Sequence, residues 1–116
     1  MPKREEEFIQ MAVMQYLRMH HRTREVAFHP ANERKTSPQH GAKLKAMGVL
    51  AGVSDIVLPI PTKLYHGLFL ELKAPGGKLT ATQKLFLKAV NAQGYLGVVA
   101  YSTQEAINVI DNYLRD

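Results

Sequence analysis

The segment 67–73 limits the fold of this chain more than any other, because it has the character of a buried strand and still carries charge. Its length and its apolar residues predict a strand that is covered on both faces. Side chains alternate along a strand, so Glu71 and Lys73 share one face while Leu70 and Leu72 share the other. The sequence therefore predicts an acid and an amine side by side on a buried sheet.

A second carboxylate precedes the neighbouring strand. Asp55 opens a predicted strand over residues 55–59, and a hairpin-like return through Pro61 brings it beside Glu71. Two buried carboxylates need a counter-ion, and a hard divalent cation such as Mg²⁺ or Mn²⁺ meets that need. Such an ion polarises a phosphate and lowers the pKa of a bound water, while Lys73 orients the water or stabilises the phosphorane oxygens. The pattern favours phosphodiester hydrolysis; the alternative is that Glu71 and Lys73 pair with surface partners on an edge strand.

The spacing of these residues resembles that of a known nuclease superfamily. Asp55 is followed 16 positions later (71 − 55) by Glu71-Leu72-Lys73, as in the PD-(D/E)xK nucleases. Over nearly the whole chain the sequence resembles the VRR-NUC (virus-type replication-repair nuclease) family of that superfamily. The residues that carry this resemblance are Gly48, Gly52-Val53-Ser54-Asp55, Phe69 to Lys73, Gly77-Lys78-Leu79-Thr80, Gln83 and Gly94-Tyr95. Ser54 stands where the superfamily has proline, which affects the turn rather than the chemistry.

The resemblance implies a restriction-endonuclease-like core and a metal-dependent endodeoxyribonuclease that uses Mg²⁺ or Mn²⁺. By the same resemblance Asp55, Glu71 and the carbonyl of Leu72 bind the metal, Lys73 assists the water, and Gln83 and Glu7 support the site. Gln83 is equally explained as the helix-start residue of a capping box with Thr80, and Glu7 as an exposed acid at the positive end of a helix.

The resemblance also implies branched DNA such as a Holliday junction as substrate, a homodimer, and a role in DNA repair in bacteria or phage-infected cells. Two alternatives stay open. The domain could be a DNA-binding module of a repair or replication complex with weak or no cleavage, or a nuclease for flaps or duplex ends. A small structural protein is a third reading, in which the charged strand is incidental.

Composition agrees with one small nucleic-acid-binding domain over residues 1–116. The 116 residues leave room for one core, and no apolar run approaches a membrane span, so we expect a cytoplasmic protein. The absence of cysteine excludes disulfides and zinc-thiolate sites. A net charge of +5 and a pI near 9.6 favour a polyanionic partner.

Basic residues gather between Arg18 and Lys45, and this region is a candidate DNA surface. An ordinary solvated charge run is the other interpretation. The predicted DNA contacts are Arg22, Arg24, Arg34, Lys35, Lys43, Lys45 and Lys78.

Periodicity and capping patterns predict an α/β fold with a mixed four-stranded sheet flanked by helices, in the order α-β-α-β-β-α-β-α. Ser37-Pro38 starts the second helix and Gly48 stops it, and capping boxes at 80–83 and 102–105 open the last two helices. The expected helices cover residues 5–19, 38–47 and 80–93 and the segment after Glu105, and the expected strands cover 26–29, 55–59, 67–73 and 95–101.

Overall fold

Four helices and three strands make up the computed structural model, which describes residues 2–31 and 37–115. The predicted mixed α/β class is therefore confirmed. In chain order the elements are α1 (Pro2–Met19), α2 (Pro38–Ala46), β1 (Ile56–Leu58), β2 (Leu68–Leu72), α3 (Ala81–Ala92), β3 (Leu96–Ala100) and α4 (Thr103–Arg115).

The sheet places β2 at its centre, in the order β1-β2-β3. β1 runs antiparallel to β2 with Ile56 opposite Leu70, and β3 runs parallel to β2 with Leu70 opposite Val98. A parallel neighbour needs a crossover connection, which α3 supplies. The central position explains why β2 is apolar nearly throughout.

The predicted four-stranded sheet is corrected to three strands among the described residues, because the segment 26–29 contributes only one paired residue. Phe28 forms an isolated antiparallel bridge with Val57, with N···O distances of 3.1 and 2.8 Å. The amides of Val26 and Ala27 instead donate to the carbonyl of Thr23 in a turn. Pro30 then follows and has no amide hydrogen to continue the ladder.

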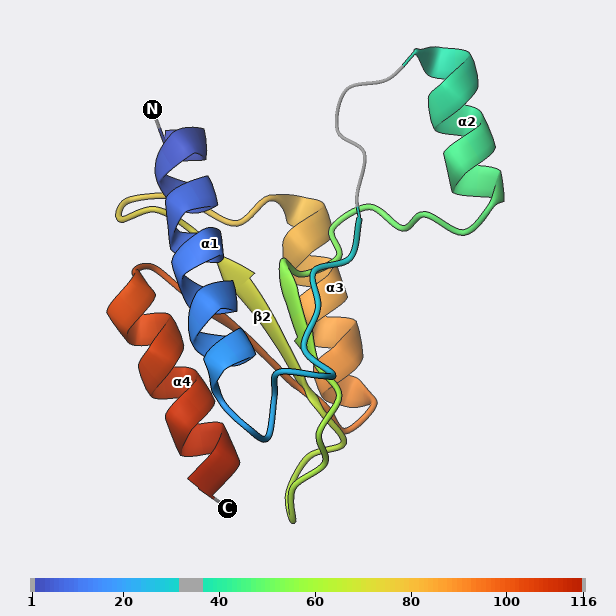
Figure 1. Cartoon of the computed structure of the whole chain (residues 1–116). Helices are drawn as coiled ribbons and strands as arrows, with labels where there is room; N and C mark the ends of the chain where they lie inside the picture. Colours follow the sequence, from blue (N-terminus) through green and yellow to red (C-terminus); the bar gives the residue numbers. More distant parts are fainter. Residues whose placement is uncertain (1, 32–36, 116) are drawn as a thin grey trace.

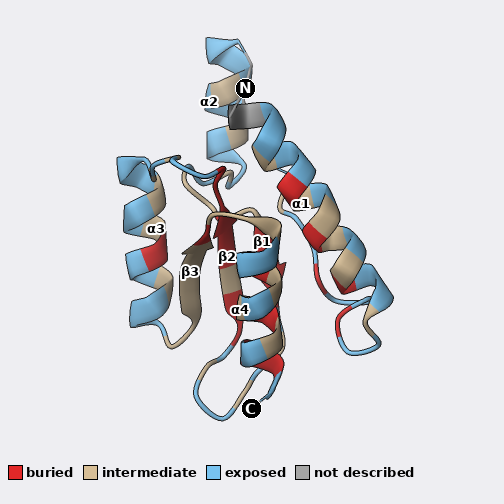
Figure 2. Ribbon diagram, turned by 90° about the vertical axis from the view of Figure 1, so that its left-hand side faces the viewer, coloured by how far each residue is buried: buried red, intermediate tan, exposed pale blue. Residues whose placement is uncertain are grey.

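Helices cover both faces of the sheet (Figures 1 and 2). α1 and α4 pack against each other and on one face, whereas α3 packs against β3 on the other. The predicted apolar stripe of α1 is confirmed, since Ile9, Val13 and Leu17 are buried in the core with Leu70. The core therefore lies between the sheet and the α1–α4 pair.

Local sequence signals set the helix ends. Thr80 accepts from the amide of Gln83 and the side chain of Gln83 returns to the amide of Thr80, which confirms the first capping box. Ser102 Oγ accepts from the amide of Glu105 at the start of α4, but the Glu105 carboxylate reaches the amide of Tyr101 instead of Ser102. Along the described chain, no helix combines the length and the apolar character that crossing a membrane requires.

Candidate active site

Four segments meet at the carboxyl end of β2, where Figure 1 also shows the first turns of α1 and the start of α3. Asp55 lies in the loop before β1, and its Oδ2 accepts a hydrogen bond from the amide of Leu72 at 2.8 Å. The ring Nδ1 of His29 lies 2.6 Å from the carbonyl oxygen of Asp55 and holds the loop on its other side. The β1–β2 hairpin thus brings Asp55 to the end of the strand that carries Glu71.

Glu71 is the most unusual charged residue of the described chain, because only 3% of it is exposed. Burial, followed by the nearby Asp55 carboxylate, raises the pKa of Glu71 to about 8, although the Lys73 ammonium acts in the opposite direction. The two carboxyl groups are close enough to share a hydrogen bond. When both are ionised, Glu71 Oε1 has no donor among the described residues. A proton, a cation or a bound water would satisfy this buried oxygen.

Gln83 connects the site to the helix start. Its Oε1 accepts from the amide of Thr80 at 2.8 Å, and its Nε2 donates to Glu71 Oε2 at 3.0 Å. One amide group therefore closes the capping box and also fixes the orientation of the buried carboxylate. The capping-box interpretation of Gln83 is confirmed, and its role in supporting a catalytic site stays a prediction.

Lys73 follows directly on β2 and is 9% exposed. Its backbone amide donates to the carbonyl of Ala100 at 2.9 Å, which extends the pairing with β3 by one residue. Its ammonium lies near enough to Glu71 to lower the pKa of that carboxyl group. A cation is thus held beside two carboxylates with little access to water.

Glu6, and not Glu7, faces the site from α1. Glu6 Oε2 lies 3.4 Å from the amide of Ala74, and its charge helps to raise the pKa of Glu71. Glu7 is exposed. Helical periodicity contained this signal: Glu6 precedes Val13 by seven residues and therefore shares its buried face, whereas Glu7 lies about 100° away.

Gly52 shows how closely the loop before β1 approaches α3. Its φ is +86°, and a Cβ there would lie 2.4 Å from the carbonyl oxygen of Thr82. Only glycine allows this backbone shape and this contact, which keeps Asp55 near the start of α3. Ser54 beside it is 2% exposed, and its hydroxyl has no hydrogen-bond partner among the described residues.

The residues present fit a hard divalent cation. Asp55 and Glu71 offer carboxylate oxygens, and the lone Glu71 Oε1 is a buried acceptor that lacks a donor. Within residues 2–31 and 37–115 no cluster of three or more acidic, histidine or cysteine side chains has metal-binding geometry. A metal here therefore requires further ligands from backbone carbonyls, water or the phosphate of a substrate.

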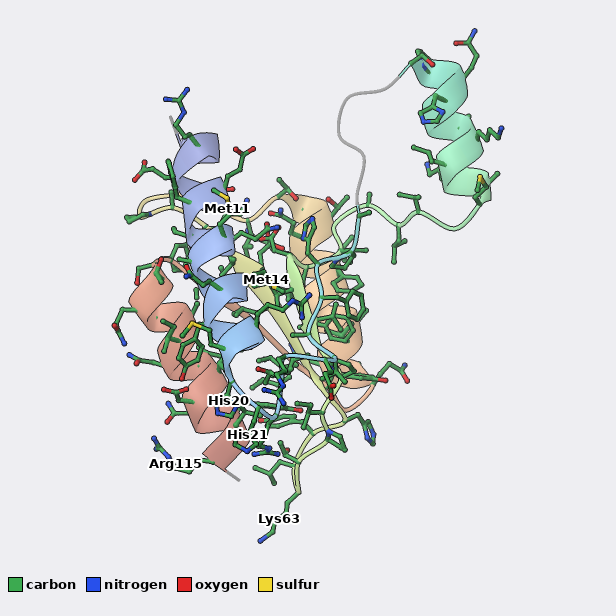
Figure 3. All side chains as sticks on the ribbon, viewed as in Figure 1. Met11, Met14, His20, His21, Lys63 and Arg115 are labelled. Carbon is green, nitrogen blue, oxygen red and sulfur yellow. The ribbon has the colours of Figure 1, made fainter. Side chains whose placement is uncertain are left out.

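The described residues that were predicted to contact DNA lie in three separate parts of the fold. Arg22 lies past the C-terminal end of α1, where its guanidinium donates to the carbonyl of Leu114 at 2.8 Å, and Arg24 follows it. Figure 3 shows His20, His21 and Arg115 together at that end. Lys43 and Lys45 lie on α2, and Lys78 lies in the turn after β2. Arg34 and Lys35 lie outside the described residues.

The mixed sheet brings two acids and a lysine together at the carboxyl end of its central strand in an α/β domain. The model of the VRR-NUC domain matches residues 5–104. A solved structure named "VRR_NUC domain protein" aligns with a TM-score of 0.82 and 30% sequence identity, over 95% of this chain and 88% of that one. Among curated proteins, none matches the chain. The chain therefore belongs to the VRR-NUC family, a nuclease-type family for which DNA is the implied substrate.

Proposed function

We propose that this protein is a divalent-metal-dependent endodeoxyribonuclease whose metal ligands are Asp55 and Glu71. The observation that carries the proposal is the carboxylate pair of half-buried Asp55 and buried Glu71, in which Glu71 Oε1 lacks a donor among the described residues and Lys73 stands beside Glu71. A structural ion pair between Glu71 and Lys73 alone does not explain why the Asp55 carboxylate lies beside Glu71 or why the pKa of Glu71 is raised. Mg²⁺ and Mn²⁺ are the ions that such oxygen ligands prefer.

Each residue has a defined task in hydrolysis. Asp55 and Glu71 would hold the ion together with the Leu72 carbonyl, and Glu71 would have to be ionised to act as a ligand. The bound ion supplies Lewis acidity, which polarises the scissile phosphate and eases ionisation of the attacking water. Lys73 positions that water and stabilises the negative charge that develops on the phosphorane oxygens. Water oxygen bonds to phosphorus, the bond from phosphorus to the leaving sugar oxygen breaks, and that oxygen takes up a proton.

Three side chains support this arrangement. Gln83 holds Glu71 through its Nε2, and its own position is fixed by the capping box. Glu6 adds a third carboxylate at the edge of the site and fills the role that the sequence assigned to Glu7. Lys78, in the turn beside Glu6, contacts the DNA backbone.

Nicking of supercoiled plasmid tests the proposal. We expect cutting with Mg²⁺ or Mn²⁺, none with EDTA, and binding with little cutting in Ca²⁺. Full activity in excess chelator contradicts the mechanism, whereas tight binding without cutting under every metal supports the alternative of a DNA-binding module.

The finer proposal is that branched DNA is cut by a homodimer. The stand-alone modules that the chain resembles act as dimers, and a two-fold assembly matches the symmetry of a four-way junction. Purified protein incubated with labelled junctions, flaps, splayed ends and plain duplexes tests the preference. A solution mass near the monomer value of 13.0 kDa removes the dimer and favours simple ends.

A further inference from the structure

α2 and its flanks, residues 37–48, form an arm that stands away from the domain. None of the α2 residues is buried, and α2 makes no extensive packing contact with another described helix or strand. Figure 1 shows the arm apart from the sheet and its covering helices. A short helix gains most of its stability from packing, so a helix exposed on every side needs a contact from outside the domain.

The positive charge of the arm indicates which kind of partner it contacts. Residues 37–54 contain no aspartate or glutamate, and Lys43 and Lys45 in the last turn of α2 are the charged residues of this stretch. Both lysines are exposed. A one-sign positive surface on a protruding helix is complementary to the phosphates of a nucleic acid.

The base of the arm lies at the candidate active site. Gly52 approaches Thr82 at the start of α3, and Asp55 follows three residues later. In Figures 1 and 2, α2 lies at the same end of the molecule as the N-termini of α1 and α3. On another side of the site, Lys78 projects from the turn whose Gly77 lies near the Glu6 carboxylate. The base of the arm and Lys78 therefore flank the candidate site on two sides.

The contacts of the other basic residues support a nucleic acid as the partner of the arm. The arginines at the opposite end make structural bonds: Arg18 donates to the carbonyls of Arg24 and Ala27, and Arg22 donates to that of Leu114. Those contacts stabilise the chain after α1 and the end of α4. Among residues 2–31 and 37–115, the α2 lysines have no comparable contact that holds the fold together, so toward this part of the chain their charge is available to a ligand.

We propose that the α2 arm binds the phosphate backbone of double-stranded DNA beside the point of cleavage, through Lys43 and Lys45. This inference rests on the proposed function for the location of the cut, but binding by the arm does not require cutting. The arm then extends the footprint of a small domain along the duplex arm next to the scissile phosphate. It determines affinity and KM, and leaves the chemical step to Asp55, Glu71 and Lys73.

A second copy of the chain is the competing occupant. Met47 and Leu50 are 72% and 59% exposed, and with Leu44 and Val49 they line an apolar groove at the base of the arm. A protein partner would bury these side chains. The lysines favour DNA, because two like charges in a stretch (37–54) that contains no acid repel a second copy of the same arm.

Metal-free binding of a labelled duplex, measured over a range of salt concentrations, tests the proposal apart from cleavage. We expect Lys43→Gln/Lys45→Gln to reduce the magnitude of the log K against log[salt] slope by about 2. By the same relation its affinity falls about 30-fold at about 0.15 M salt. In Mg²⁺ the same variant should raise KM and leave kcat unchanged. The matched control is Lys63→Gln/Lys88→Gln, which removes the same charge elsewhere, with Lys63 at the far end of the molecule (Figure 3).

Three results overturn the arm proposal. One is an unchanged salt slope in Lys43→Gln/Lys45→Gln, and another is an equal change in the control. The third is a dimer mass that Met47→Ser/Leu50→Ser reduces to the monomer while the lysine variant binds DNA normally, which assigns the arm to a second copy. If wild-type protein never cuts DNA but the slope changes as expected, the proposed function fails and the arm proposal stands.

Discussion

The carboxyl end of β2 and the α2 arm both carry charge, but they hold it in opposite surroundings. Glu71 and Lys73 are buried at the carboxyl end of β2, where the Lys73 amide donates to the carbonyl of Ala100 and Gln83 donates to the Glu71 carboxylate. Lys43 and Lys45 are exposed on a helix that has no buried residue. Buried charge costs free energy and persists only with compensation, whereas exposed charge costs almost nothing.

This difference in burial determines how a substitution in each region should affect the protein. At β2 a small change of residue should alter chemistry, because Asp55, Glu71 and Lys73 lie close to one another. On the arm the same kind of change should alter only the long-range attraction of DNA. We therefore expect variants at the end of β2 to change kcat and variants of the arm to change KM.

The largest expected effect comes from isosteric removal of the site carboxylates. Asp55→Asn and Glu71→Gln should each slow single-turnover cleavage by about a thousandfold or more, since a lost metal ligand removes several kcal/mol of transition-state stabilisation. Affinity for DNA in EDTA should hold or rise, because negative charge beside the phosphate path is lost. Cleavage at the wild-type rate by either variant contradicts the site.

Truncation of one leucine in each region tests the same comparison by stability. Leu70→Ala should lower the free energy of unfolding by about 2–5 kcal/mol, since Leu70 is fully buried in the core. Leu44→Ala on α2 should change it by less than about 0.5 kcal/mol. Chemical denaturation measures both, and equal losses would mean that the arm packs on the domain.

The two neighbouring acids of α1 provide a smaller and more specific test. Glu6→Gln should slow cleavage by about tenfold through its effect on the buried pair, within the range of a single supporting interaction. Glu7→Gln, an exposed matched control, should leave the rate unchanged. Steady-state kinetics on one substrate separates the two, and the reverse result restores the prediction from the sequence.

A separate effect concerns pH in the absence of metal. The pKa of Glu71 is raised from 4.5 to about 8 on folding, so the folded state binds more protons than the unfolded state between these values. Stability should therefore fall as pH rises from about 4.5 to 8. In Glu71→Gln this part of the decline should disappear from thermal melts in EDTA, and identical profiles for the two proteins contradict the raised pKa.

The residues whose positions the sequence predicted correctly lie at the carboxyl end of β2. Alternation along the buried strand was enough to place Glu71 and Lys73, and the hairpin was enough to bring Asp55 beside them. Gln83 followed from its capping box. Each of these residues lies where backbone geometry leaves one arrangement.

The sequence predictions that were wrong failed because of the tertiary structure. The strand expected at 26–29 is reduced to one bridge because a turn at Thr23 takes two of its amides. The basic stretch from Arg18 to Lys45 looked continuous along the chain, but its described parts lie at opposite ends of the molecule (Figures 1 and 3). Proximity in sequence says little about a surface when a loop separates the residues.

The most direct test of the account is calorimetric titration of metal-free protein with Mn²⁺ at pH 7, in two buffers of different ionisation enthalpy. We expect Mn²⁺ to bind with release of a proton, because Glu71 is protonated below its pKa of about 8 and must ionise to act as a ligand. Glu71→Gln should lose both the binding and the proton release, while Lys43→Gln retains them. Mn²⁺ binding of unchanged affinity in Glu71→Gln would contradict a metal centre at the end of β2.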